Sequence, residues 1–405
     1  RLVGSEMCIR DSYTPGAVTI AKKQVTVTAS NHNVNYGDAV PTVTAGYSGL
    51  VNGDTSDVVS ETSCSTTYST TSSAGTSQST SCSGASATNY TFVYTGGSVT
   101  VGKRTLTITA GSPSLTYGDP IPSISASFDG FINGDDNRVI SSMTCTTVYT
   151  ERSNAGSAPA TFCSGGSATN YALNYVGGSV TIARKALSIT APVIASKVYD
   201  TTRTVSAGQV TLGTLSGCVN IYIDCVDVTF ASGLYNSEHV LTATSATINY
   251  TLVDKSGLAS NYTLAPSTGV SASITPKALS IGAPSLASKV YDSFTTAGTC
   301  TPGSLSGTVG GETLGVSCVG AAYSSANVGS YTSTITYTLT NGTSGTIGVA
   351  SDYSLASGSA TGAVTAKALS IGAPSLASKV YDGTTTAGTC TPGTLSGLVG
   401  SQTLG

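Results

Sequence analysis

The chain repeats itself at a fixed interval, and this feature constrains its fold more than any other. Tyr36-Gly37-Asp38 recurs as Tyr117-Gly118-Asp119, 81 residues later, and a second motif, Ser-Lys-Val-Tyr-Asp, ends at Asp200, Asp292 and Asp382. Intervals of this size are too long for the repeat of a solenoid. They fit a small domain that has its own core. The sequence therefore predicts a tandem array of domains.

The repeats divide the chain into consecutive segments. Each predicted domain begins beside a basic residue, and the domains are 23–103, 104–184, 185–276, 277–366 and an incomplete copy at 367–405. Residues 13–22 match the end of a domain, so we expect them to be the last hairpin of a preceding domain. Residues 1–12 match no repeat, and we expect them to be a non-native, adapter-like scar. We expect the last copy to stop before its second cysteine.

The composition excludes several classes of protein. Charged residues make up 9% of the chain and the net charge is −3, against about 25% charged residues in ordinary domains. Without a basic stretch, nucleic-acid binding lacks its electrostatic footprint. No apolar run is long enough to span a membrane, so we expect no membrane segment in this fragment. A hydrophobic content of 39% with 21 tyrosines is too apolar for a disordered stalk.

The local patterns are those of β-strands. Apolar residues alternate with threonines around Val25 and Val27, which is typical of a half-buried strand. After the strand expected at 90–94, Gly96-Gly97 predicts a type I′ hairpin into a strand at 98–101, because both central positions of that turn need positive φ. We predict an all-β array of small immunoglobulin-like β-sandwich domains. The alternative is a β-grasp-like domain with one short helix in each copy.

The cysteines fall into pairs within the predicted domains. Apart from Cys8 and Cys390, the candidate disulfides are Cys64 with Cys82, Cys145 with Cys163, Cys218 with Cys225, and Cys300 with Cys318. The first pair is symmetric about a turn at Ser73, and opposite residues of a hairpin lie close enough for a disulfide. Reduced core thiols and metal binding are the alternatives, and metal binding is disfavoured because no histidines lie near the pairs. Disulfides predict an oxidising compartment and an exported protein.

The strand that carries Cys64, or its counterpart Cys318, is expected to form its disulfide with a different neighbouring strand in each repeat type. Cys64 aligns with Cys318, but Cys82 lies downstream of the first and Cys300 lies upstream of the second. We therefore expect one strand to be joined to a different neighbour in each type of domain.

Some polar residues allow two interpretations. His32 and His239 do not recur in other copies, and we expect both on surface loops or strand edges. The Asn-Gly-Asp segments could supply calcium ligands near Asp54, Asp57, Asp135 and Asp136. The alternative is a turn leading into a short helical turn, with Asp54 or Thr55 capping residues 57–59.

Basic residues gather where one predicted domain follows another. They are Lys22, Lys23, Lys103, Arg104, Arg184, Lys185, Lys277 and Lys367. Without a Gly/Ser-rich linker between the domains, the array should be stiff. We expect these charges to be solvated at domain edges, where they oppose edge-to-edge pairing. The alternative is a row of contacts along a rod.

The motifs resemble two known families. The Tyr-Gly-Asp repeats, with Ser-Gly-Leu-Val-Asn-Gly-Asp ending at Asp54 and Ala-Thr-Asn-Tyr ending at Tyr90, are similar to MBG domains of the YGX type. The repeats that run from Lys-Ala-Leu-Ser-Ile to Ser-Lys-Val-Tyr-Asp resemble YDG domains. The resemblance implies a secreted bacterial surface protein of the filamentous-haemagglutinin-like adhesin kind. It implies no catalytic residue.

The expected function is structural. We expect a stiff repeat stalk of a secreted cell-surface adhesin that projects a binding region away from the cell. The alternative is that the repeats themselves bind glycans or host or matrix proteins weakly, through avidity. The sequence has no Gly-x-Ser-x-Gly elbow and no phosphate-binding loop, so we expect no catalysis. No catalytic, cofactor-binding or metal-binding residue is assigned.

Overall fold

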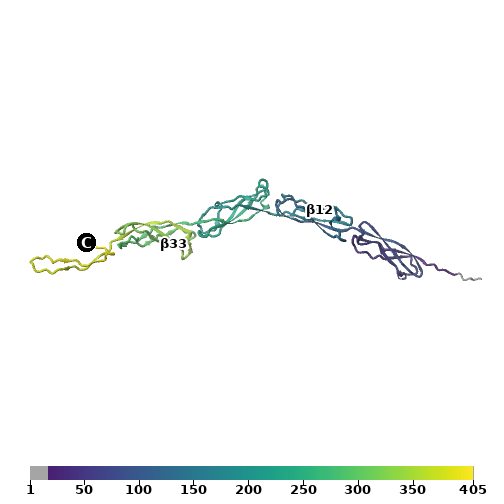
Figure 1. Ribbon diagram of the computed structural model, residues 1–405, viewed down its shortest axis with the longest axis horizontal. Coiled ribbons are helices and arrows are strands. Elements are labelled where there is room, and N and C mark those ends of the chain that lie inside the picture. Colours follow the sequence, from purple (N-terminus) through teal and green to yellow (C-terminus); the bar gives the residue numbers. More distant parts are fainter. Residues whose placement is uncertain (1–16, 405) are drawn as a thin grey trace, which may run out of the picture. The chain divides into compact units, whose positions relative to one another are not determined.

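The structure is a computed structural model that describes residues 17–404. The expected scar at 1–12, with Cys8, lies outside the described residues, as does the first part of the expected hairpin at 13–22. Its described part, 17–22, has no regular secondary structure. The chain divides into two compact units, one ending at Arg184 and the other starting at Lys185 (Figure 1). Each unit contains two complete predicted domains, and the second also contains the incomplete copy at 367–405.

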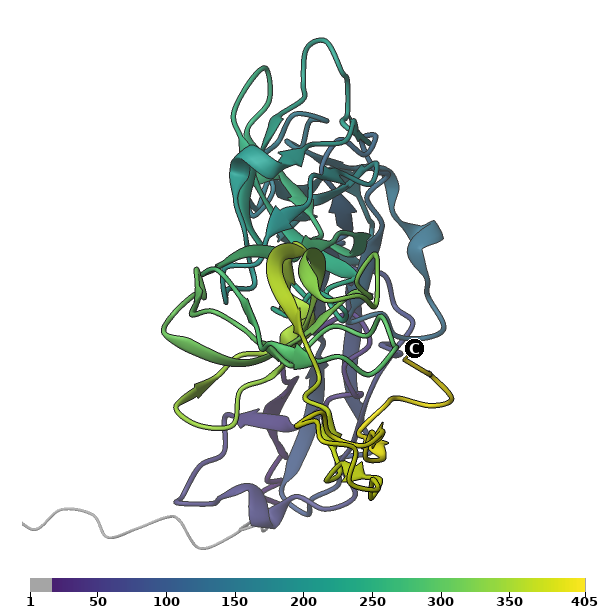
Figure 2. The ribbon, with the colours of Figure 1, turned by 90° about the vertical axis from the view of Figure 1, so that its left-hand side faces the viewer.

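The described residues form strands and five 3₁₀ helices of three residues each, without an α-helix. Figure 2 shows that coiled ribbon is confined to short turns. No helix in the described part of the chain is long and apolar enough to cross a membrane. The prediction of an all-β array is therefore confirmed. Each of the four domains does contain a short 3₁₀ helix, but the strands of a domain form separate sheets, which fits the predicted β-sandwich rather than the β-grasp-like alternative.

The first domain packs two sheets. Its elements are β1 (Lys23–Ala29), β2 (His32–Asn35), β3 (Ala45–Ser48), η1 (Ser56–Val58), β4 (Ser63–Thr66), β5 (Ser77–Ser83), β6 (Tyr90–Thr95) and β7 (Gly97–Gly102). One sheet has the order β3-β1-β6 and the other β2-β7-β5-β4. The pairs β1–β6 and β2–β7 are parallel, and the other pairs are antiparallel.

The second domain repeats this arrangement. Its elements are β8 (Arg104–Ala110), β9 (Ser114–Thr116), β10 (Ala126–Asp129), η2 (Asn137–Val139), β11 (Ser141–Thr147), β12 (Ala160–Ser167), β13 (Tyr171–Val176), β14 (Gly178–Ser179) and β15 (Thr181–Ala183). The sheet β10-β8-β13 corresponds to β3-β1-β6. The alternating apolar residues of β8 point into the core, where Leu106 and Ile108 are fully buried.

The expected hairpin at Gly96-Gly97 is wrong. The strands on either side of these glycines, β6 and β7, belong to different sheets, and neither glycine has a positive φ. The glycines serve close packing instead, because a Cβ on Gly97 would lie 2.5 Å from the Ala29 carbonyl oxygen and 2.8 Å from Thr80 Oγ1. Gly178, one repeat later, faces the same crowding, with the Ala110 carbonyl oxygen at 2.6 Å.

The third and fourth domains use shorter edge strands around long central ones. The third consists of β16 (Lys185–Ile189), β17 (Val193–Ile194), β18 (Lys197–Val198), β19 (Thr204–Val205), η3 (Ala207–Gln209), β20 (Val210–Thr211), β21 (Leu215–Ser216), β22 (Asp227–Tyr235), β23 (Ser245–Val253), η4 (Ala259–Asn261), β24 (Tyr262–Leu264), β25 (Ser267–Ser271) and β26 (Ile274–Thr275). Its main sheet has the order β19-β22-β23-β25, and β21-β16-β24 forms a second sheet.

The fourth domain has the largest sheet in the described residues. It consists of β27 (Lys277–Ile281), β28 (Ser285–Leu286), β29 (Lys289–Val290), β30 (Cys300–Thr301), β31 (Leu305–Ser306), β32 (Glu312–Gly320), β33 (Gly329–Asn341), β34 (Thr346–Ile347), η5 (Ala350–Asp352), β35 (Tyr353–Leu355) and β36 (Gly358–Thr365). Strands β29-β36-β33-β32-β34 form that sheet, in which β33 is the longest strand (Figure 1).

The last segment forms only two short ladders. Strand β37 (Ser370–Ile371) pairs with β40 (Leu395–Ser396), and β38 (Ser375–Leu376) pairs with β39 (Cys390–Thr391). Cys390 is a free, exposed cysteine.

The structure contains the four predicted disulfides. Cys64 lies directly opposite Cys82 in the hairpin β4–β5, and Cys145 lies opposite Cys163 in β11–β12. Cys300 and Cys318 lie instead on β30 and β32, which belong to different sheets. The same strand is thus joined to a different neighbour in the two domain types, as the alignment predicts. Each 18-residue loop should contribute about 3 kcal/mol in the chain-entropy model.

Candidate docking sites between domains

Each of the four domains carries the same three-part site. The backbone N–H of an apolar residue donates to a tyrosine hydroxyl, and that hydroxyl donates to a nearby carboxylate. The four sites are Val51, Tyr90 and Asp54; Ile132, Tyr171 and Asp135; Val219, Tyr262 and Asp224; and Val309, Tyr353 and Glu312. We call this set the tyrosine–carboxylate site of a domain. It combines the Asn-Gly-Asp segment, or its counterpart, with the motif Asn-Tyr or Asp-Tyr.

The site of the second domain receives a tyrosine from the first. Tyr36 of the Tyr-Gly-Asp motif donates its hydroxyl to Asp135 Oδ2 at 3.1 Å, and Tyr171 donates to the same oxygen at 2.7 Å. The rings of Tyr36 and Tyr171 meet edge to face, with centroids 5.6 Å apart. A carboxylate that accepts from two tyrosines needs no cation to satisfy it, and hydrogen bonds to a charged group are among the stronger ones.

The fourth domain receives a tyrosine from the third in the same way. Tyr199 of the Ser-Lys-Val-Tyr-Asp motif donates to Glu312 Oε1 at 2.9 Å, and Tyr353 donates to the other oxygen. The rings of Tyr199 and Tyr353 are also edge to face, 5.3 Å apart. Tyr36 and Tyr199 are called the docking tyrosines below. One copy of each repeated motif, at Tyr36 and at Tyr199, is therefore a contact site between domains.

The surroundings keep these phenols neutral. Burial, reinforced by the hydrogen bond to Asp135, raises the pKa of Tyr171 to about 12. Burial and the bond to Glu312 raise the pKa of Tyr353 to about 12 and also raise the pKa of Tyr199. A phenolate beside a carboxylate would place two like charges together, so each hydroxyl remains a donor at physiological pH.

A second contact joins a hairpin turn to the residue before the site tyrosine. In the first unit, the Ala74 N–H of the β4–β5 turn donates to Asn170 Oδ1 at 3.0 Å. In the second unit, the Val240 N–H donates to Asp352 Oδ1 at 2.7 Å, and His239 Nδ1 lies 2.6 Å from Asp352 Oδ2. Asp352 is fully buried, and these two contacts supply the polar partners that a carboxyl group needs away from water.

The rest of the Tyr-Gly-Asp loop also contacts the second domain. Gly37 has φ +81°, and a Cβ there would lie 1.7 Å from Ile132 Cδ1. Asn133 Nδ2 donates to the Thr70 carbonyl oxygen at 2.9 Å. Arg104 forms an ion pair with Asp38 at 3.4 Å. All three positions of the motif therefore face the next domain.

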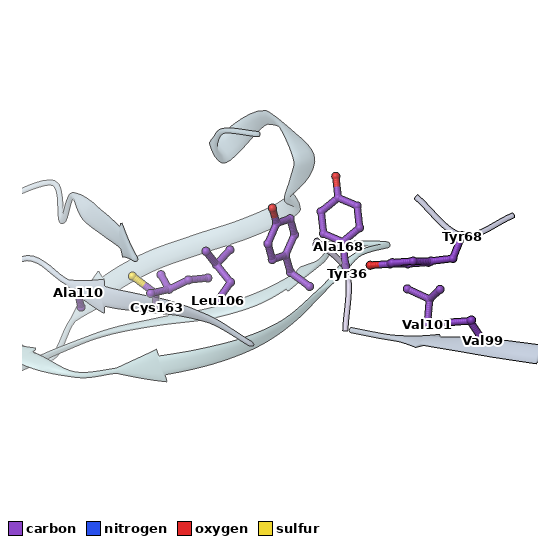
Figure 3. Close-up of a cluster of buried hydrophobic side chains, with 10 residues drawn as sticks. Tyr36, Tyr68, Val99, Val101, Leu106, Ala110, Cys163 and Ala168 are labelled. Carbon is purple, nitrogen blue, oxygen red and sulfur yellow. The ribbon is translucent and has the colours of Figure 1, made fainter. Parts of the chain in front are cut away.

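The hydrophobic core continues across both junctions. One buried cluster joins Tyr36, Tyr68 and Val101 of the first domain to Leu106 and Tyr171 of the second (Figure 3). A second cluster joins apolar residues of the third domain to Leu279 and Tyr353 of the fourth. Core continuity restricts hinge motion more than polar contacts alone, because bending must expose apolar surface to water.

The four aspartates considered as calcium ligands have separate roles. Asp54 and Asp135 accept tyrosine hydroxyls. Asp57 receives the Thr55 hydroxyl in a turn where Thr55 caps η1, and Asp136 caps η2 through the Arg138 N–H. The capping interpretation thus holds for Thr55 and Asp136. Among residues 17–404, no three His, Cys, Asp or Glu side chains are grouped as metal ligands would be.

The two histidines differ in their surroundings. His32 lies on the edge strand β2 and bonds Ser30 Oγ at 2.8 Å, as expected of an edge histidine. His239 lies on a loop with its side chain 41% exposed, as expected, and its ring also contacts Asp352. Its loop packs against the next domain, and Asp352 there offers a buried anion that an isolated histidine in the sequence could not reveal.

The junction lysines and Arg104 make specific contacts. Lys22 Nζ donates to the Ala87 carbonyl oxygen at 3.2 Å, and Lys103 Nζ donates to the Ala168 carbonyl oxygen at 2.8 Å, one repeat later. Lys22 and Lys103 remain exposed to solvent, as expected, and together with the Arg104 ion pair they also make specific contacts near the domain edges.

Comparisons with known families agree with the motifs. Residues 25–100 and 106–181 match the model of the MBG domain (YGX type). Residues 183–269 and 275–361 match the model of the YDG domain. No curated protein matches the chain in sequence.

Three solved structures are similar to the chain at low scores. The I9–I11 tandem of titin is 10% identical, covers 64% of this chain and 99% of its own, and has a TM-score of 0.20. Drosophila N-cadherin EC1-3 is 6% identical, covers 64% of this chain and 99% of its own, and has a TM-score of 0.16. The extracellular domain of protocadherin GammaB4 is 9% identical, covers 88% of this chain and 69% of its own, and has a TM-score of 0.20.

Proposed function

The chain consists of tandem MBG domains of the YGX type followed by YDG domains, and from this premise we propose that it is a stiff spacer in a secreted bacterial surface adhesin. In this role the domains hold a binding region away from the cell and carry out no catalysis. The observation that carries the proposal is the core that continues across the junction within each unit.

The disulfides support export. Each of the four lies within one domain, and such bonds persist in oxidising surroundings rather than in the cytosol. They tie strands together inside each domain, while the tyrosine–carboxylate sites of the second and fourth domains tie those domains to the ones before them. A spacer needs both kinds of restraint, because it must resist unfolding as well as bending.

Small-angle scattering of the full chain tests the stiffness. The wild-type protein is compared with a double variant, Tyr36→Ala with Tyr199→Ala, in which both docking tyrosines are removed. We expect a broader distribution of interatomic distances for the double variant at unchanged β-sheet content. Equal distributions would contradict the spacer role of these junctions.

A binding assay separates the spacer from a module that binds by itself. The full chain is applied to glycan arrays and to surfaces coated with matrix protein. A spacer gives no saturable binding. Saturable binding that increases steeply when the chain is displayed in many copies would favour the avidity model instead.

A further inference from the structure

The tyrosine–carboxylate site of the first domain is complete but open to solvent. Tyr90 donates to Asp54 Oδ2 at 2.6 Å and receives the Val51 N–H at 3.2 Å. A hollow there is lined by Val51, Asn52, Asp54, Asn89 and Tyr90, together with residues 20–23. The side chain of Val51 is 41% exposed, whereas its counterpart Ile132 packs against Gly37 in the second domain.

The open site has the same backbone geometry as the occupied one. Asn52 has φ 61° and Gly53 φ 82°, and their counterparts Asn133 and Gly134 have φ 55° and 79°. Asparagine is one of the non-glycine residues that adopt this left-handed conformation most readily, so an Asn-Gly turn can take it up without a bound partner. The site of the first domain therefore adopts its binding geometry with no docked tyrosine present, which lowers the ordering cost of binding.

The chain also enters the two domains in the same manner. The Lys23 N–H donates to the Asn89 carbonyl oxygen at 2.9 Å, and the Arg104 N–H donates to the Asn170 carbonyl oxygen at 3.0 Å. A domain joined at Lys23 would thus be tethered as the first domain is tethered at Arg104.

We propose that this face of the first domain binds the Tyr-Gly-Asp loop of another MBG domain of the YGX type. The phenol hydroxyl of that loop donates to Asp54 beside the edge of the Tyr90 ring. A turn amide of the same domain donates to the Asn89 side chain, as Ala74 does to Asn170. The occupied site of the second domain is the evidence for the identity of the occupant.

The length of the acid selects the type of loop. In this chain an aspartate accepts the tyrosine of a Tyr-Gly-Asp loop, and the longer Glu312 accepts the tyrosine of a Val-Tyr-Asp loop. Asp54 has the shorter side chain, so its site fits the Tyr-Gly-Asp type.

The test is an extended chain in which a second copy of residues 23–103 replaces residues 1–22. This graft keeps the spacing of the natural junction, because Lys103 of the copy takes the place of Lys22. Hydrogen–deuterium exchange is measured in the peptides 49–55 and 86–91. We expect at least tenfold slower exchange there than in the unextended chain.

Two matched variants of the extended chain make the test specific. One carries alanine at the copy's counterpart of Tyr36, and the other carries Asp54→Ala. Both should exchange as fast as the unextended chain in these peptides. Fast exchange in the extended chain with both tyrosine and aspartate intact would overturn the proposal, as would slow exchange in either variant.

An internal control separates this proposal from the proposed function. Peptide 130–136 reports the junction that Tyr36 already makes with Asp135. Peptide 130–136 could be protected in every chain while exchange in peptide 49–55 is never slowed. In that case the first domain has no such docking site although the spacer junction is intact.

Discussion

The junction between the two MBG domains and the junction between the two YDG domains have the same centre but different surroundings. Both place two tyrosine hydroxyls on one carboxylate, Asp135 in the first unit and Glu312 in the second. Around this centre, Asn170 is replaced by Asp352, which contacts His239. The centre is the constant part because a half-buried carboxylate that is partly removed from water is well satisfied by two hydroxyl donors. The surroundings vary because many polar side chains can accept a hydrogen bond from one backbone N–H of a turn.

The difference in charge has a physical consequence. The MBG junction contains one carboxylate at its centre and a neutral amide beside it. The YDG junction contains two carboxylates, Glu312 and the fully buried Asp352, and both raise the pKa of Tyr199 in addition to the effect of burial. Asp352 also contacts the His239 ring, with Nδ1 2.6 Å from Oδ2. The YDG junction should therefore depend more on its polar contacts than the MBG junction does.

Removing a docking tyrosine should have the largest effect in both junctions. Tyr36 is 5% exposed and Tyr199 is 2% exposed, so truncation of either to alanine should weaken the coupling of its two domains by about 3–5 kcal/mol. Calorimetry of the full chain should then resolve the unfolding of two domains that melt together in the wild type. Tyr36→Phe and Tyr199→Phe are the controls, and each should cost about 1 kcal/mol. A single unchanged transition in Tyr36→Ala would show that the ring does not couple the domains.

The substitution Asp352→Ala should separate the two junctions. It leaves the Val240 N–H without its acceptor and removes the partner of His239, for a cost of about 3 kcal/mol. The matched change Asn170→Ala removes one neutral bond to Ala74 and should cost about 1 kcal/mol. Urea unfolding of the full chain measures both values. Equal losses would mean that the extra charge of the YDG junction has no energetic role.

Gly37→Ala tests the packing that is specific to the MBG junction. The new methyl group must displace Ile132 Cδ1, and the alanine backbone must keep the positive φ of Gly37. Gly53→Ala is the matched control, since Gly53 has φ +82° with no atom within 4 Å of the added Cβ. We expect about 1 kcal/mol for the control and about 2–3 kcal/mol for Gly37→Ala, because the clash adds to the cost of strain. Equal melting temperatures in the two variants would exclude a tight contact at Gly37.

Alkaline pH should weaken both junctions gradually. The folded-state pKa values of Tyr171 and Tyr353 are raised to about 12, above about 10 in the unfolded chain. The stability that they contribute is fully present below pH 10 and is lost as pH rises through about 12. Ultraviolet titration of tyrosinate with parallel circular dichroism measures this loss. In the variant Tyr171→Phe, the first unit should lose less stability at alkaline pH than in the wild type. An unchanged loss of stability would show that Tyr171 does not cause it.

Repetition alone allowed much of the architecture to be predicted. The period predicted an array of tandem domains, and the symmetry of Cys64 and Cys82 about Ser73 indicated the hairpin that the structure shows. The prediction of a hairpin at Gly96-Gly97 was wrong. Two adjacent glycines are used either for positive φ or for close approach of the backbone, and the local sequence does not distinguish these two uses.

The docking sites could not be recognised from one domain at a time. Tyr36, Asp135 and Tyr171 lie far apart in the sequence, and each has a plausible role inside its own domain. A signal was available in retrospect, because Tyr-Gly-Asp, Asn-Gly-Asp and Asn-Tyr repeat together at the same interval. Motifs that recur as a set in consecutive domains can mark the contact of one domain with the next. His239 gave no such signal, since it occurs in one copy only.

Residual dipolar couplings of the full chain test the central claim most directly. The claim is that the two domains of each unit are held as one body by a docking tyrosine, a carboxylate and a continuous core. Couplings from residues 23–103 and 104–184 should then fit one alignment tensor with the same magnitude and orientation. Two different tensors, or a much smaller magnitude for one of the domains, would show that the MBG junction is a hinge and would contradict the account.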